Sequence, residues 1–378
     1  MDKLYWRYID EKEVTGSYGL AADEHFMLAV TQEDYPFPAN LRLYNYADYS
    51  ALCGRFQNLS AEIDLQKCSE LGYDVGRRLT GGGAIIMGRE QLGLCLTIDG
   101  AQIEYKNTRD LYRHFATPVI DALAQMGIHA GFKSKNDIEV EGKKIAGLGV
   151  HVDKAGGLQF HTSLLVDLNI NDMLEVLRIP IQKYDDRIKI RAVNQRMTTV
   201  KKEANGHYGM EQVKQIIRES FRRYFGIFFV EKEVTETEKR AIAALEDARY
   251  KHPDWLYQFS PREDLSGMSL YKTPAGLLRT YIGLKGDTIK SVLITGDFME
   301  AVPVLRDIEA QLKWSPLDAA HIGEIIRQAY ERHKESQRLL KQEDLLHAIM
   351  LAGRKAKVAL EYHYNGSCYY PKQKVDAV

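Results

Sequence analysis

Ten residues, RRLTGGGAII from Arg77 to Ile86, constrain this chain more than any other stretch. Three consecutive glycines are costly to order, because glycine loses more conformational freedom on folding than any other residue. This cost indicates that something approaches the backbone closely. The arginines ahead of the glycines place cations beside unobstructed backbone N–H groups, a combination that suits a phosphate or an adenylate.

The glycine cluster fits neither of two common phosphate-binding loops. A dinucleotide-binding G-x-G-x-x-G opens a helix, whereas these glycines lead into a strand-like run from Ala84 to Met87. A P-loop needs Lys and then Ser or Thr after its last glycine, but Arg89 and Glu90 follow Gly88. A tight turn between two strands remains the structural alternative to an anion site.

Composition excludes several classes of function. The 378 residues carry 51 basic and 52 acidic side chains, and a net charge of −1 gives no case for a nucleic-acid or membrane-surface partner. We find no apolar segment typical of a signal peptide or a membrane span. The four cysteines form no C-x-x-C pair, which fits a reduced compartment, so we expect a cytoplasmic protein.

Hydrophobic periodicity predicts several short strands and three helices over the first 255 residues. Pro118 predicts a kink or a break in one helix, and a capping box at Thr235 and Glu238 opens another. The predicted strands are 41–46, 49–54, 85–87, 93–98 and 160–168, with a hairpin over 138–148, and the predicted helices are 107–126, 210–225 and 235–250.

A smaller pattern follows an irregular, charged connection over 251–268. It predicts a hairpin and then two helices, the first capped by Asp297 with Glu300 and the second started by Ser315 and Pro316. We therefore expect a first domain over 1–255, a small accessory domain over 256–340 and a tail of unknown role over 341–378.

Two further stretches complete an ordered set of motifs. KSKNDIEVEGKKIAGLGV, residues 133–150, joins Asn136-Asp137 to a hairpin that carries Lys144, and FHTSLLVDL, residues 160–168, holds His161. Together with RRLTGGGA and the turn GRFQN at 54–58, they resemble the lipoate–protein ligase A family in type and order. The resemblance covers about residues 3–260. It implies an α+β fold, a mixed-sheet catalytic domain of the biotin/lipoate ligase type with a small C-terminal α+β accessory domain.

The resemblance also implies a reaction. Lipoate would be activated by ATP with Mg²⁺ to an acyl-adenylate and passed to a lysine of a lipoyl carrier domain. Acceptors in the family are acyltransferase subunits of 2-oxoacid dehydrogenases and the glycine-cleavage H protein. Lys144 is the implied catalyst, and Asp137 is the candidate Mg²⁺ ligand through water. The implied substrate and ATP contacts are Arg55, Arg77, Arg78, Thr80, Gly81, Gly82, Gly83, Ala84, Asn136, Asp137, Gly147 and His161.

Each of these residues has a structural alternative. The alternative for Lys144 is a solvated residue on a strand. Adjacent strand residues face opposite ways, and we assign the solvated position to its neighbour Lys143. Asn136-Asp137 would form an Asx turn, and His161 and Arg55 would be structural. Three apolar candidates for an acyl tunnel would equally be core residues: Met87, Leu94 and Leu148.

Departures from the family pattern concern the substrate subclass. The family has His-Asp after the glycine strand and then Gly-Asn, whereas this chain has Met87-Gly88 and Glu90-Gln91. Lys135 stands where the family has Arg.

Three rivals remain to be weighed against a ligase. An octanoyl transferase of the same superfamily passes the acyl group through an exposed cysteine thiolate, but Cys95 lies in an apolar run, which leaves Cys53 and Cys68. A biotin ligase would need a Gly-Arg-Gly-Arg cluster, which is absent. A lipoate- or nucleotide-binding protein without turnover is the non-enzymatic alternative.

Overall fold

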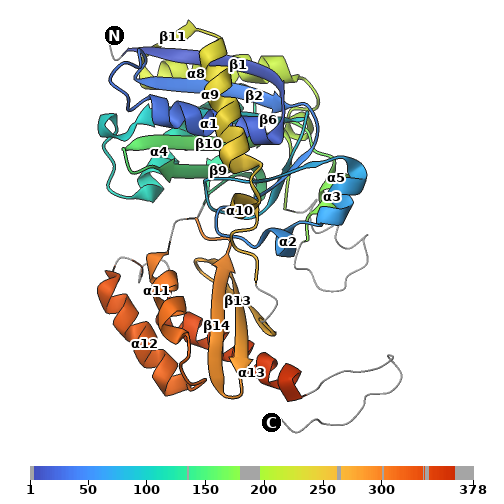
Figure 1. The fold of residues 1–378 in the computed structure, drawn as a ribbon. Helices are drawn as coiled ribbons and strands as arrows, with labels where there is room; N and C mark the ends of the chain where they lie inside the picture. Colours follow the sequence, from blue (N-terminus) through green and yellow to red (C-terminus); the bar gives the residue numbers. More distant parts are fainter. Residues whose placement is uncertain are drawn as a thin grey trace. The chain divides into compact units, whose positions relative to one another are not determined.

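The computed structural model describes residues 4–133, 136–178, 196–261, 265–299, 302–334, 336 and 340–361 (Figure 1). The chain divides into two compact units. The first comprises residues 1–55, 60–80 and 84–256, and the second comprises residues 56–59, 81–83 and 257–378. The glycine turn is thus grouped with the C-terminal part of the chain.

An eight-stranded mixed sheet, β11-β1-β2-β6-β10-β9-β8-β7, forms the centre of the first unit. β11, β1 and β2 are parallel, and the strands from β2 to β7 pair antiparallel. A smaller sheet has the order β4-β3-β5. The α+β class with a mixed sheet is therefore confirmed. The strands are β1 (Tyr5–Val14), β2 (Ala39–Tyr46), β3 (Ser50–Cys53), β4 (Asp74–Arg77), β5 (Ile85–Met87), β6 (Gln91–Asp99), β7 (Gly131–Phe132), β8 (Asp137–Val140), β9 (Lys143–Val152), β10 (Gly157–Leu165) and β11 (Phe228–Glu231).

The two faces of the large sheet differ in chemistry, because residues opposite each other on paired strands share a face. On the apolar face, Phe160 packs on Phe115 of α4, with ring centroids 5.2 Å apart. On the polar face, Arg42 reaches Asp23 of α1. Cross-strand rows on the apolar face are Leu41, Leu96, Phe160, Val150 and Leu43, Leu94, Thr162, Leu148; on the polar face they are Arg42, Cys95, His161, Gly149 and Tyr44, Gly93, Ser163, Gly147.

Helices cover both faces (Figure 1). α4 and α8 pack together on the apolar side, and α1 with α9 lies on the polar side. On the polar face, Lys144 and Gly147 of β9 and His161 and Ser163 of β10 are only half-buried, so they are left for a site. The helices up to residue 256 are α1 (Gly16–Ala29), α2 (Leu59–Glu62), α3 (Leu65–Leu71), α4 (Thr108–Gln125), α5 (Ile170–Val176), α7 (Val200–Glu203), α8 (Met210–Phe225), α9 (Glu236–Leu245) and α10 (Pro253–Leu256).

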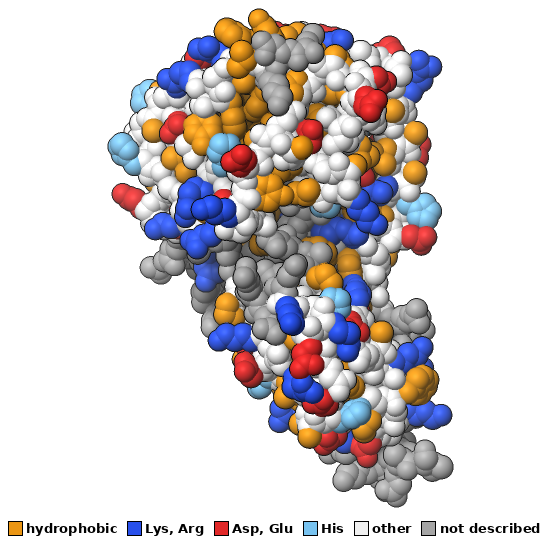
Figure 2. Space-filling model, turned by 90° about the vertical axis from the view of Figure 1, so that its left-hand side faces the viewer, with side chains coloured by type: hydrophobic (Ala, Val, Ile, Leu, Met, Phe, Trp, Pro, Cys, Tyr) orange, Lys and Arg blue, Asp and Glu red, His pale blue; other side chains and the backbone are white. Residues whose placement is uncertain are grey.

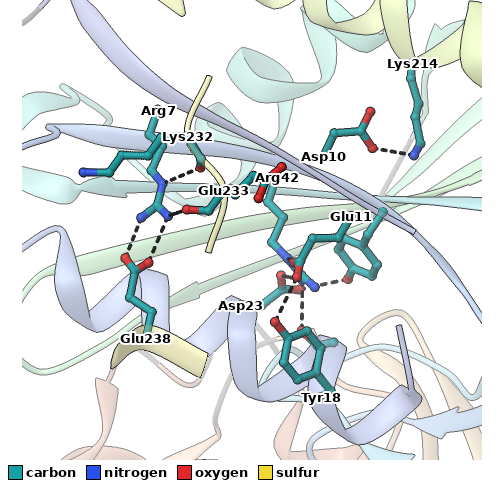
Figure 3. A network of polar contacts seen from close by, with 12 residues as sticks. Arg7, Asp10, Glu11, Tyr18, Asp23, Arg42, Lys214, Lys232, Glu233 and Glu238 are labelled. Carbon is teal, nitrogen blue, oxygen red and sulfur yellow. Dashed lines mark hydrogen bonds and ion pairs between the residues drawn. The ribbon is translucent and has the colours of Figure 1, made fainter. Parts of the chain in front are cut away.

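Charged side chains buried around β1 and β2 are paired (Figure 3). Arg7 donates to Glu238 of α9 at 2.5 Å, and Arg42 lies between Glu11 at 2.5 Å and Asp23 at 2.7 Å. A buried charge without a partner costs several kcal/mol, so these pairs have to form together with the packing of α1 and α9. They fix the helices beside the open part of the polar face.

The second unit has its own core. An antiparallel sheet, β12 (Gly267–Thr273), β13 (Gly276–Lys285) and β14 (Thr288–Gly296), packs with α11 (Pro303–Leu312), α12 (Ala319–Arg332) and α13 (Gln342–Glu361). Apolar residues of α13, among them Leu345, Ile349 and Ala352, are fully buried in this core. Residues 342–361, which the sequence pattern left unplaced, are thus part of the unit.

The sequence predicted most elements to within a few residues. The helix over 210–225 and the capping box of Thr235 with Glu238 are confirmed. Pro118 does not break α4, which is continuous. The starts of the last two predicted helices are wrong: α11 has Val302 at its N-cap, and α12 is capped by Asp318, whose carboxylate accepts from His321 N–H. Glu300 lies outside the described residues.

Two surface properties bear on function. No described helix has the length and apolarity needed to cross a membrane. Figure 2 shows acidic and basic side chains scattered together over the face that it draws, in keeping with the net charge of −1.

Candidate active site

A β-bulge places the amine of Lys144 on the polar face. β8 and β9 pair with Asp137 opposite Gly147 and Ile138 opposite Ala146, but the register then shifts, so that Glu139 lies opposite Lys144. Without this shift, simple alternation would put Lys144 on the face of Leu148, opposite to that of Gly147. The extra residue is Ile145, which is fully buried.

The ammonium of Lys144 is held above Gly147. Its Nζ lies 2.7 Å from Asp137 Oδ1, and the two side chains are 29% and 30% exposed. A Cβ on Gly147 would come within 2.9 Å of this Nζ, so the lysine uses the space that a side chain would fill. The amine is therefore fixed in position but reachable by a ligand.

The start of β9 is anchored by a segment distant in sequence. Lys144 N–H donates to Arg196 O at 2.8 Å, and Thr198 N–H donates to Lys144 O at 2.9 Å. Thr198 also lines a cavity of about 290 Å³. Its walls are Asp167, Leu168, Ile170, Met197, Thr198, Thr199, Lys201 and Lys202.

A second polar pair, Thr80 and His161, lies on the same face. His161 is opposite Gly149, two residues along the strands from the pair of Ser163 and Gly147. Thr80 Oγ1 and His161 Nε2 are 3.2 Å apart. A Cβ on Gly149 would lie 2.9 Å from this hydroxyl and 2.8 Å from His161 Cδ2. Gly149 therefore makes room for the pair as Gly147 does for Lys144. The sequence analysis assigned no role to Gly149, although its spacing of two residues from Gly147 was an available signal.

His161 stays neutral at physiological pH. Burial, and to a lesser degree the charge of Arg78, lowers the pKa of His161 to about 3. A neutral imidazole carries one donor and one acceptor nitrogen, so His161 acts as a hydrogen-bonding group rather than as a cation.

Both predicted arginines face main-chain oxygens in this structure. Arg77 is fully buried and donates to the carbonyls of Trp255, Leu256, Gly54 and Arg55. Arg78 donates to Leu52 O at 2.7 Å, and burial lowers its pKa to about 10, so it remains charged at neutral pH. Contact with phosphate stays a prediction for both residues.

The structure gives a reason for two of the glycines in the glycine turn. Gly82 has a φ of 93° and donates its N–H to Phe298 O at 2.8 Å. A Cβ on Gly81 would collide with the same carbonyl oxygen. Gly83 is exposed and nothing lies within 4 Å of its Cβ position. The close approach that the sequence indicates is thus made by the chain itself at Gly81.

The remaining predicted residues frame the site or support it. Asn136 Nδ2 donates to Leu148 O at 2.9 Å, which clamps the segment before β8 onto β9. The Arg55 guanidinium stacks over the Trp255 ring at 4.2 Å, and Arg55 N–H donates to Thr80 O. Ala84 is half-buried just before β5. The first unit therefore gathers Thr80, Asn136, Asp137, Lys144, Gly147 and His161 on one part of the sheet.

The apolar candidates for an acyl tunnel are core residues. Met87, Leu94 and Leu148 are each at most 3% exposed. Leu94 and Leu148 lie in one row of the apolar face, on the opposite side of the sheet from Lys144.

The described residues hold no cluster of three or more His, Cys, Asp or Glu side chains that would bind a metal ion. The described cysteines, Cys53, Cys68 and Cys95, are all buried, and burial raises the pKa of each thiol, for Cys68 to about 11. None of these three thiols has the thiolate character that a nucleophile needs. Cys368 lies outside the described residues.

Comparison with known proteins gives a consistent result. The family model of the lipoyl protein ligase A/B catalytic domain matches residues 16–222. The lipoate–protein ligase LplJ of Bacillus subtilis is 26% identical over 75% of this chain and 83% of its own length. The octanoyltransferase LipM of Kyrpidia tusciae is 24% identical over 67% of this chain and 98% of its own.

One solved structure is similar over nearly all of the chain. The Plasmodium falciparum LipL1 structure in complex with lipoate has a TM-score of 0.67 at 17% identity, over 91% of this chain and 98% of that one. At this identity the likeness establishes the fold alone.

Proposed function

The chain belongs to the lipoyl protein ligase A/B catalytic-domain family, and we propose that it is an ATP-dependent lipoate–protein ligase. Family membership makes it similar to ligases and octanoyltransferases alike. The ligase assignment rests on the geometry around Lys144 and on the state of the cysteines.

The proposed reaction has two steps. A free carboxylate is a poor acyl donor, so a carboxylate oxygen of lipoate attacks the α-phosphorus of ATP, and pyrophosphate leaves. The resulting lipoyl-adenylate is a mixed anhydride. The amine of a carrier lysine then attacks its carbonyl carbon, an amide bond forms, AMP leaves and the amine loses a proton.

The observation that carries the proposal is the position of the Lys144 ammonium. It is fixed by Asp137 over the side-chain-free backbone of Gly147, and it remains partly exposed. In this position the ammonium would bridge the carboxylate and the α-phosphate and offset the charge that builds up as they react. Removing one such fixed donor typically lowers a rate by about 100- to 1,000-fold.

Neighbouring groups have complementary roles in the proposal. Thr80 and neutral His161 would hydrogen-bond the adenylate, and the charged Arg78 would add positive potential from its buried position. Arg55, Ala84 and Asn136 would bound the nucleotide, and contact of Gly81, Gly82 and Gly83 with it stays a prediction.

Magnesium would enter with the nucleotide. Mg²⁺ keeps several waters and needs only one or two carboxylates besides phosphate oxygens, so a single carboxylate, that of Asp137, suffices. The ion would neutralise phosphate charge. Asp137 would hold the ion through water.

The cysteines favour the ligase over a transferase. A transferase would need an exposed thiolate, whereas the three described cysteines are buried with raised thiol pKa values.

The similarity to LipM covers 67% of this chain, whereas the similarity to the LipL1 structure covers 91%. The second unit thus has a counterpart in the LipL1 fold.

The proposed acceptors are lipoyl domains of 2-oxoacid dehydrogenases and the glycine-cleavage H protein. Lipoate-dependent exchange of labelled pyrophosphate into ATP tests the first step, and mass spectrometry of a lipoyl domain tests the second. Octanoyl transfer between carriers without exchange would instead support a transferase. Ligand binding with neither activity would support a non-catalytic protein.

A further inference from the structure

Ser163 lies in the polar row formed by Tyr44, Gly93, Ser163 and Gly147. It lies on β10 with Gly93 opposite on β6 and Gly147 opposite on β9. The ring of Tyr44 covers Gly93, where a Cβ would be 2.5 Å from a ring carbon, and the tip of Lys144 covers Gly147. Because both cross-strand neighbours are glycines, Ser163 supplies the side chain between the phenol and the ammonium.

The hydroxyl of Ser163 and the amine of Lys144 converge on one point. The Cβ position of Gly147 is 2.9 Å from Lys144 Nζ and 3.3 Å from Ser163 Oγ. Ser163 is half-buried, and its hydroxyl donates to Gly147 O at 3.5 Å, which is at the limit of a hydrogen bond. The hydroxyl of Ser163 therefore lies near the amine of Lys144, and its long hydrogen bond to Gly147 O would give way to a shorter one with a ligand carboxylate.

Resting on the proposed function, we infer that Ser163 is a substrate-binding residue for the first step. Its hydroxyl donates a hydrogen bond to the oxygen of the acyl carboxylate that does not attack phosphorus, while Lys144 binds the attacking oxygen and the α-phosphate. No covalent bond to Ser163 forms. A carboxylate gripped through both oxygens presents one of them to phosphorus in a fixed orientation.

Thr162 supplies a matched control within the same strand. It also carries a hydroxyl, but it lies on the apolar face, is 3% exposed, and its Oγ1 has no hydrogen-bond partner among the described residues. Replacing such a hydroxyl by a methyl group of similar shape is neutral or stabilising. Thr162→Val should therefore keep exchange activity and melt at the same temperature or higher.

The test compares Ser163→Ala, Ser163→Thr and Thr162→Val in lipoate-dependent ATP–pyrophosphate exchange. A hydrogen bond to a charged group is worth about 1.5–3 kcal/mol, so Ser163→Ala should lower kcat/KM for lipoate by about 10- to 100-fold. Ser163→Thr, which keeps the hydroxyl, should stay near the wild type. KM for ATP should change little, since the hydroxyl contacts the acid and not the nucleotide.

The outcomes separate this inference from the proposed function. If the wild type exchanges and Ser163→Ala equals Thr162→Val, the role of Ser163 is wrong while the ligase stands. If the wild type shows no exchange, both are overturned. Melting curves check folding, and Ser163→Cys, with a weak donor of similar size, replaces the alanine variant should that variant not fold.

Discussion

The two faces of the large sheet use the same strands for opposite purposes. On the apolar side, β6, β9 and β10 carry leucine, valine and phenylalanine side chains, with α4 packed on them. On the polar side, the same strands present glycines, His161 and Ser163. Because successive residues of a strand face opposite ways, one strand contributes both to core packing and to the site. Substitutions one residue apart should therefore affect different properties, either the free energy of unfolding or the activity.

The largest effect expected on the apolar face is that of Phe160→Ala. Phe160 is fully buried against Phe115, so truncation should cost about 3–5 kcal/mol of unfolding free energy. Urea denaturation measures this loss. Protein that remains folded should keep the KM for lipoate of the wild type, and an altered KM would show that the faces are not separate.

On the polar face the largest effect is that of Lys144→Ala. We expect exchange to fall by about 100- to 1,000-fold, because the group that offsets developing charge is removed. Lys143→Ala is the matched control, since its pairing with Val140 places it on the other face of the hairpin. Near-wild-type exchange in the Lys144 variant would assign the catalyst elsewhere.

Gly149→Ala tests whether space on the polar face is required. The new methyl group would meet Thr80 Oγ1 at 2.9 Å and the ring of His161, and overpacking of this kind costs about 1–3 kcal/mol. We expect reduced exchange with a smaller loss in melting temperature than for Phe160→Ala. Leu148→Met, a volume-conserving change on the apolar face, is the control, and equal losses of exchange would contradict the comparison.

The smallest effect is a pH dependence of stability. His161 has a pKa of about 3 in the folded protein and an ordinary value near 6.5 when unfolded, so the unfolded state binds the additional proton between these values. Stability should fall as the pH drops below 6.5, by at most about 1.4 kcal/mol per pH unit from this group. His161→Gln should flatten the curve measured by urea denaturation at pH 7, 6 and 5. Parallel curves would mean that His161 titrates normally.

Local signals explain what the sequence could predict. The amphipathic pattern of 210–225 and the capping box at Thr235 depend on residues within one or two turns, and both are found as expected. The motif residues Asp137, Lys144 and Gly147 lie in one hairpin, so their proximity was also a local matter.

Features that depend on distant partners were not predictable. Gly81 avoids the carbonyl of Phe298, more than 200 residues later, and Arg77 is held by carbonyls near Trp255. The burial of α13 depends on a sheet whose first strand, β12, the pattern missed. The importance of Ser163 appears only when the register of β6, β9 and β10 is known.

The bulge at Ile145 makes the register of the hairpin as important as its composition. Deleting this single residue would restore regular alternation with Lys144 still opposite Glu139, so the amine would stay on the polar face. Keeping Ile145 in a register without the bulge would instead turn the amine of Lys144 into the hydrocarbon layer. The bulge, more than the identity of any one residue in the hairpin, thus decides on which face the amine lies.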